Sequence, residues 1–338
     1  MELVFVHLNT PLPKYLEYNL HNCIRMFPEK QVVLLHNHLV NPPRIEGLRA
    51  VIIEAESRWN ELDQLYSHPK DFRGNFWLTS SARLFALEDY INSTNEEIIH
   101  LESDVIVSQD FPFESFHKLE KGLAFPLISD QRGVASVVYI RDKKAAQILT
   151  STLISEARKD PQTTEMLSLK KVYQNNKEYI QILPIGPRHL DAYRNITQKF
   201  AIELVQAHSI FNGVFDGSEI GQFFAGTDPR NRRGKILLRY DLVEGFANIK
   251  NWTLNYDSIR SFANIGLNGK EEVAKVFALH MPVKDPKIFD RKTQAKVLMQ
   301  ICVNGTNPEG VRISIKILFL AILGMVRRRL GFEKLKHS

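Results

Sequence analysis

The stretch LVFVHLNTPLPKYLEYNLHNCIRMFPEKQVVLLH, residues 3–36, decides the fold that we predict. It begins with an apolar run at 3–8 that is typical of a buried strand. After a loop with two prolines, apolar residues follow at helical spacing over 14–26, and a second apolar run occupies 31–36. Strand, helix and strand joined by short loops are typical of a parallel sheet.

The same pattern continues downstream. We expect further strands at 50–54, 97–101, 105–107, 123–126, 135–140, 179–183 and 276–280, and helices at 75–92 and 143–159. Residues 212–234 form a polar, glycine-rich connection, and the loose alternation over 236–263 is typical of short antiparallel strands. The predicted fold class is therefore α/β, with a mixed, mainly parallel sheet flanked by helices and a C-terminal helical tail.

Composition sets broad limits on function. The chain has 338 residues, 44% hydrophobic and 24% charged, which is ordinary for a globular protein. Its net charge of +6 fits an anionic partner. The basic residues gather near the C-terminus without a recognisable nucleic-acid module, so we expect no nucleic-acid partner. Cys23 and Cys302 make no metal-ligand spacing, and reduced thiols indicate the cytoplasm.

The last part of the chain, 291–338, is predicted to be a basic, helical tail after a main domain at 1–290. Ten nearly all-apolar residues, Ile317–Val326, precede Arg327–Arg329. A membrane-spanning helix needs roughly 20 such residues, so this run is too short to cross a bilayer. Two alternatives stay open: a buried C-terminal helix, or a helix lying at the inner face of the membrane with its arginines on anionic headgroups.

Two carboxylates follow the predicted strand at 97–101. Glu102 and Asp104 stand at the strand's carboxyl end, where open α/β sheets bind their ligands. Hard cations such as Mn²⁺ or Mg²⁺ take carboxylate oxygens and bridge phosphates. The alternative is a solvated strand end. We predict a metal site here because three other residues complete the pattern.

Those residues are Arg83, His280 and Lys284. Arg83 lies on the helix before the carboxylates and is predicted to reach a diphosphate; its alternative is a surface cation paired with Glu88 or Asp89. His280 ends the last predicted strand and is a candidate third metal ligand, or else a structural histidine. Lys284 is predicted to neutralise a diphosphate.

This ordered set resembles the GT-A fold glycosyltransferases, in particular the bacterial sugar transferases of lipopolysaccharide and capsule assembly. In that group a helix carries an Arg or Lys that reaches the donor, a strand ends in Asp-x-Asp, and a late His and Lys serve the metal and the diphosphate. Glu102-Ser103-Asp104 departs from the usual motif in its first carboxylate. The resemblance covers 3–290, and the segment 215–231 is similar to one in uncharacterised bacterial transferases.

The resemblance implies a nucleotide-sugar-binding half at 1–110 and an acceptor half at 111–290. It also implies donor contacts from the loops after the first two strands, and donor-sugar or acceptor contacts from later loops. The donor candidates are His7, Asn9, Thr10 and Asn37, and the later candidates are Asp130, Arg132, Asp216, Glu219 and Gln222. Asp216 to Glu219 also fits the start of a helix.

The expected function is metal-dependent transfer of a sugar from a nucleoside diphosphate sugar, of the UDP-sugar kind, to a glycan or lipid-linked acceptor in surface polysaccharide biosynthesis. If the reaction inverts the anomeric centre, Asp216 is the first candidate base and Asp130 the second. One rival is a sugar nucleotidyltransferase, although the loop at 9–13 lacks the glycines that such enzymes usually need. Another is a non-catalytic glycan-binding protein on a transferase fold.

Overall fold

The computed structural model describes residues 1–225 except 39, 54, 55 and 74. It then describes 252–257, 262–267, 273–282, 284, 286 and 290. The predicted tail at 291–338 lies outside the described residues. Among the residues that are described, no helix is long and apolar enough to cross a membrane.

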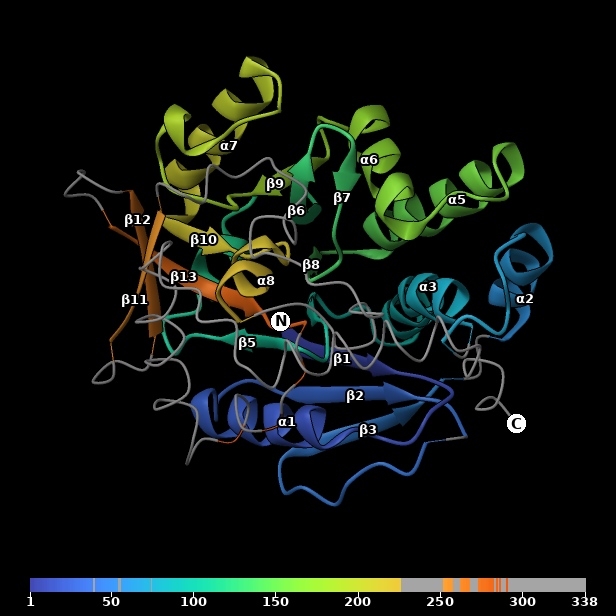
Figure 1. Cartoon of the computed structure of the whole chain (residues 1–338). Helices are drawn as coiled ribbons and strands as arrows, with labels where there is room; N and C mark the ends of the chain where they lie inside the picture. Colours follow the sequence, from blue (N-terminus) through green and yellow to red (C-terminus); the bar gives the residue numbers. More distant parts are fainter. Residues whose placement is uncertain are drawn as a thin grey trace, which may run out of the picture.

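A large mixed sheet forms the centre of the molecule (Figure 1). Its order is β3-β2-β1-β4-β8-β6-β7, and β9 pairs with β6. The first four strands in this order are parallel to one another, while β8 runs antiparallel to both β4 and β6. The bounds are β1 (Glu2–His7), β2 (Val32–His36), β3 (Leu48–Ile52), β4 (Ile98–Leu101), β6 (Leu123–Ser129), β7 (Arg132–Gly133), β8 (Val137–Ile140) and β9 (Ile180–Leu183). The predicted mixed, mainly parallel sheet is confirmed.

Helices cover both faces of this sheet, because alternate residues of its buried strands point to opposite sides. Val4 and Val6 of β1 join a core with the helices α3 and α5, whereas Leu3 and Phe5 join a second core with α1. The helices are α1 (Lys14–Met26), α2 (Glu56–Leu65), α3 (Phe76–Thr94), α4 (Phe113–His117), α5 (Lys143–Lys159), α6 (Glu165–Asn175), α7 (Gln198–Phe211) and α8 (Glu219–Ala225). The helices predicted at 14–26, 75–92 and 143–159 are confirmed.

A smaller sheet lies beside the large one (Figure 1). It contains β10 (Gly213–Phe215), β13 (Val273–His280), β12 (Phe262–Leu267) and β11 (Trp252–Asp257), in that order. β5 (Val105–Val107) pairs antiparallel with β13, so the chain passes from the large sheet to the small one directly after β4. The predicted connection at 212–234 was wrong where the structure describes it, because β10 and α8 occupy this part of the chain.

Candidate active site

The turn between the two sheets carries the predicted carboxylates. Glu102 follows β4 and Asp104 precedes β5, and the turn is closed by a hydrogen bond from the Val105 amide to the Glu102 carbonyl, 3.1 Å. In the antiparallel pair of β5 and β13, His280 lies opposite Val105. The amide of Met281 donates to the Asp104 carbonyl at 2.8 Å. Strand pairing therefore brings His280 beside both carboxylates.

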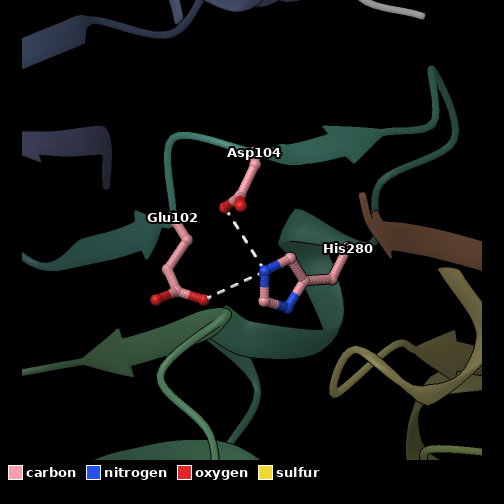
Figure 2. Close-up of side chains that lie close together, drawn as sticks. All are labelled: Glu102, Asp104 and His280. Atoms are coloured by element: carbon pink, nitrogen blue, oxygen red, sulfur yellow. Dashed lines mark ion pairs between the residues drawn. The ribbon is translucent and has the colours of Figure 1, made fainter. Parts of the chain in front are cut away.

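Figure 2 shows the carboxylates of Glu102 and Asp104 directed toward the same imidazole nitrogen of His280. Nε2 of His280 is 3.3 Å from Asp104 Oδ1 and 3.5 Å from Glu102 Oε2. The three candidate ligand atoms all lie within 4.8 Å of one another. Glu102 Oε2 is buried and has no hydrogen-bond partner among the described residues. A divalent cation fits this donor set, because it would bind that oxygen together with the other two groups.

Charge holds the three groups together in spite of their burial. Desolvation alone would raise the pKa of Glu102, but Arg83 and His280 hold that pKa below its usual range. Desolvation also opposes ionisation of Asp104, yet His280 and Lys284 lower its pKa. Burial lowers the pKa of His280, but Asp104 and Glu102 outweigh it and raise the pKa to about 9. Two ionised carboxylates therefore face one cationic ring, and a bound metal ion would take the place of the ring's proton.

Lys284, which was predicted to neutralise a diphosphate, lies beside the same cluster. Its Nζ is 3.3 Å from Asp104 Oδ2 and 6.0 Å from the centre of the Tyr15 ring. The backbone of Lys284 is left-handed, with φ 53°. A non-glycine residue adopts this conformation at a cost, and such residues are common at binding sites.

Arg83 forms ion pairs with the carboxylates of Glu102 and Glu165. Its guanidinium donates from Nη1 to Glu102 Oε1 at 2.5 Å, and from Nη2 to the two oxygens of Glu165 at 3.3 and 3.2 Å. Its Nε donates to the Ser80 carbonyl at 3.0 Å. The alternative partner Glu88 pairs with Arg58 instead. The side chain predicted to reach a diphosphate thus fixes the orientation of Glu102, a candidate metal ligand.

Glu165 is a site residue that the sequence analysis did not find. It is the first residue of α6, after Thr164, whose side chain caps the helix by accepting from the Leu167 amide. Burial raises the pKa of Glu165 to about 7, against the attraction of Arg83. A threonine followed by a glutamate is a helix-start signal, but nothing in that signal points to Arg83, 82 residues away in the sequence.

A cavity of about 750 Å³ contains the cluster. Most of the predicted site residues line it, including both carboxylates, His280 and Lys284. Apolar and aromatic side chains form other parts of its wall. The predicted residues in the lining are His7, Thr10, Arg83, Glu102, Asp104, Arg132, Glu219, Gln222, His280 and Lys284.

Three other predicted contacts lie outside the cavity lining. The side-chain amide of Asn37 donates from Nδ2 to Oδ1 of Asn9 at 2.6 Å, and the backbone amide of Asn9 donates to Oδ1 of Asn37 at 3.2 Å. This exchange holds together the loops that follow β1 and β2. Asp130 lies in the turn between β6 and β7. The structure therefore brings Asn9 and Asn37 together and places Asp130 in a turn.

Asp216 has a different place from the one predicted for a catalytic base. It is 1% exposed and does not line the cavity. Its carboxylate accepts hydrogen bonds from the backbone amides of Ile220, Gly221 and His280 at 3.0, 2.9 and 3.1 Å. A carboxylate held by three backbone donors and screened from the cavity cannot take a proton from an acceptor there. The prediction of Asp216 as the catalytic base is therefore wrong, and its carboxylate instead accepts from amides in the first turn of α8.

Comparisons with known proteins give similarity of fold only. No family model matches the chain, and no curated protein matches it. Among solved structures, the galactosyltransferase LgtC in complex with donor and acceptor sugar analogues is 15% identical, with 61% of this chain and 83% of that chain covered and a TM-score of 0.43. Mouse xyloside xylosyltransferase 1 is 8% identical, with 54% and 84% covered and a TM-score of 0.35.

A third solved structure is a glycosyltransferase involved in the glycosylation of the major capsid of PBCV-1. It is 12% identical, with 54% of this chain and 81% of that chain covered and a TM-score of 0.33. At these TM-scores the similarities decide nothing about the site, whose interpretation rests on the distances and burial given above.

Proposed function

We propose that this chain is a metal-dependent glycosyltransferase that uses a nucleoside diphosphate sugar. The observation that carries the proposal is the cluster of Glu102, Asp104 and His280, with Lys284 beside it, in a cavity of about 750 Å³. Small-molecule sites measure roughly 300–1,000 Å³, so the cavity suits a ligand of this size. Two carboxylates, an imidazole and an ammonium group together suit a metal ion and an anionic diphosphate.

On the donor side, Glu102, Asp104 and His280 would hold the ion. When bound, Mn²⁺ or Mg²⁺ acts as a Lewis acid that stabilises negative charge on the leaving diphosphate. Lys284 contributes a second positive charge from the wall of the cavity. Arg83 keeps the Glu102 carboxylate aimed at its partners through the 2.5 Å bond. We assign the nucleoside end of the donor to His7 and Thr10, which line the same cavity.

On the acceptor side, Glu165 and Glu219 are the cavity-lining carboxylates, among the described residues, that lie outside the metal cluster. In an inverting reaction one carboxylate takes the proton of the acceptor hydroxyl. We assign this step to Glu165, which lines the cavity, is held in place by Arg83 at 3.2 and 3.3 Å, and has a pKa that burial raises to about 7. Arg132 and Gln222 line the cavity as further acceptor contacts.

The finer parts of the proposal concern partners and location. We propose a UDP-sugar as donor, a glycan or lipid-linked acceptor in surface polysaccharide biosynthesis, and a cytoplasmic enzyme. The basic tail, with Ile317–Val326, is the part that we propose to contact the inner face of the membrane. No nucleic acid takes part.

Calorimetric titration of UDP tests the proposal. Binding should need Mn²⁺ or Mg²⁺ in the wild-type protein and should be lost in Asp104→Ala. Asp110→Ala is the matched control, because Asp110 pairs with Lys275 outside the cavity lining and should leave binding unchanged. Equal, negligible binding with and without metal in the wild-type protein would overturn the proposal. Metal-dependent UDP binding without transfer or hydrolysis of any sugar nucleotide would favour the glycan-binding alternative.

A further inference from the structure

The turn between β10 and α8 contacts the backbone of His280. Oδ2 of Asp216 accepts from the amide of His280 at 3.1 Å and from that of Gly221 at 2.9 Å. In return, the amide of Asp216 donates to the carbonyl of Ala278 at 2.8 Å. The last residues of β13 are therefore bound through their backbone to one buried aspartate, which lies 64 residues earlier in the sequence.

Asp216 is itself fixed from the other side. The hydroxyl of Ser136, which is fully buried, donates to the Asp216 carbonyl at 3.0 Å. The Ser136 carbonyl in turn accepts from the amide of Glu102 at 3.0 Å. Ser136 thus connects the turn that holds His280 to the turn that holds Glu102. Burying a carboxylate is costly unless it is hydrogen-bonded, and here three backbone amides offset part of that cost.

Gly221 allows α8 to approach the backbone of His280 closely. A β-carbon at this position would lie 1.7 Å from the carbonyl oxygen of His280 and 3.2 Å from Oδ2 of Asp216. The atom in the way is backbone, so it cannot rotate aside as a flexible side chain would. Helix α8 can pack against the end of β13 at this distance because residue 221 has no side chain.

We propose that Asp216 and Gly221 are positioning residues for His280. They fix the backbone of this residue from the side opposite β5, and so they set where its Nε2 lies between Glu102 and Asp104. The proposal rests on the proposed function, in which His280 is a metal ligand. It gives the segment FDGSEIGQ, residues 215–222, a structural purpose: it supports the ligand and does not itself carry out the chemistry.

Gly217 supplies a matched control within the same turn. A β-carbon there would lie 2.3 Å from Cγ2 of Ile128, and its three nearest atoms belong to the side chains of Ile128 and Pro126, not to His280. Gly217→Ala and Gly221→Ala therefore both crowd the turn, but only the second pushes directly on His280. A role that is merely structural would make the two variants alike.

The test compares Mn²⁺ affinity, measured by electron paramagnetic resonance, with thermal stability in the absence of metal. Both variants should lose some stability. Gly221→Ala should bind Mn²⁺ at least about tenfold more weakly, the range found for residues that orient metal ligands, while Gly217→Ala should stay within about threefold of wild type. Wild-type affinity in Gly221→Ala, or equal losses in the two variants, would overturn the proposal.

Asp216→Asn tests the role of Asp216 in positioning His280. Its amide group cannot accept from all three backbone amides, so Mn²⁺ affinity should again fall by about tenfold. Unchanged affinity in this folded variant would remove Asp216 from the proposal. Amide hydrogen exchange in the metal-free protein separates this failure from that of the proposed function. If the wild-type protein binds no metal, faster exchange at His280 in Gly221→Ala than in Gly217→Ala still supports the positioning role, and equal exchange overturns it.

Discussion

Two turns of this molecule carry acidic residues directly after a strand, and both contact His280. The turn after β4 directs the carboxylates of Glu102 and Asp104 to the imidazole ring, at 3.5 and 3.3 Å. The turn after β10 directs the carboxylate of Asp216 to the backbone amide of the same residue, at 3.1 Å. Glu102 and Asp104 line the cavity, whereas Asp216 does not.

The difference comes from the backbone amides around each turn. In the second turn, the amides at the start of α8 point at Asp216 and satisfy its carboxylate, as helix starts commonly do. In the first turn no helix follows, because the chain enters β5 and pairs with β13. Glu102 and Asp104 are therefore left facing side chains and the cavity. An acidic residue after a strand is available to bind a ligand where the local backbone does not occupy it.

The largest effect should come from removing a ligand from the first turn. Asp104→Ala deletes one of the three candidate donor groups and leaves His280 and Lys284 without this partner. Mn²⁺ affinity should fall on the order of a thousandfold, about 4 kcal/mol. Titration of the folded variant, followed by its effect on water proton relaxation, measures this. A variant that binds Mn²⁺ like wild type would mean that Asp104, in the first turn, is no more a metal ligand than Asp216 in the second.

Breaking the buried ion pairs behind the first turn should cost about 3 kcal/mol of unfolding free energy, because Arg83→Ala removes the buried cation that pairs with both Glu102 and Glu165. Urea denaturation measures the loss. Arg158→Ala is the control, since its pair with Glu61 is exposed and should contribute less than about 1 kcal/mol. Equal stability of the two variants would show that Arg83 does not support the site.

Removing the acceptor in the second turn should cost somewhat less stability. Asp216→Ala leaves three buried backbone amides without their partner, and we expect a loss of about 2 kcal/mol in unfolding free energy. Asp104→Ala, measured alongside it by urea denaturation without metal, should lose less, because its carboxylate accepts from side chains that can turn toward the cavity. A reversed order of the two losses would contradict the division of roles between the turns.

The smallest effect concerns pH, and its sign is specific to the second turn. Burial raises the pKa of Asp216 to about 6, so the folded protein binds its proton more tightly than the unfolded chain does. The stability from this group is fully present below its ordinary pKa of 3.8 and is lost as pH rises through about 6. Unfolding free energies of wild type and Asp216→Asn, compared from pH 4 to pH 7, should converge as pH rises. A gap that widens with pH would mean that the folded state favours the ionised carboxylate.

The sequence predicted those parts of the molecule that local patterns determine. Apolar runs located β1, β2 and β4, and helical spacing located α1, α3 and α5, because burial on one face leaves a period that the sequence shows. The turn after β4 was predicted for the same reason: Glu102 and Asp104 follow a strongly apolar strand. The helix start at Asp216 was likewise one of the two readings of its segment.

Contacts between distant segments could not be predicted in this way. The pairing of Val105 with His280 depends on the register of β5 and β13, which no local pattern reveals. Arg83 was predicted to bind a diphosphate because it lies on the helix before the carboxylates. Glu165, its second partner, lies on a helix that was not predicted. The backbone amide of His280 donates to the Asp216 carboxylate from 64 residues away in the sequence. The sequence could not reveal this hydrogen bond, so Asp216 was predicted to be a candidate base.

Glu102, Asp104 and His280 are proposed to form one metal site. Anomalous diffraction at the manganese edge, from crystals grown with Mn²⁺ and UDP, tests it most directly. We predict a single strong peak bound by both carboxylates and by Nε2 of His280, with the diphosphate on its open side and Lys284 beside it. Manganese bound elsewhere, or UDP bound in the cavity with no ion between these three side chains, would contradict the account.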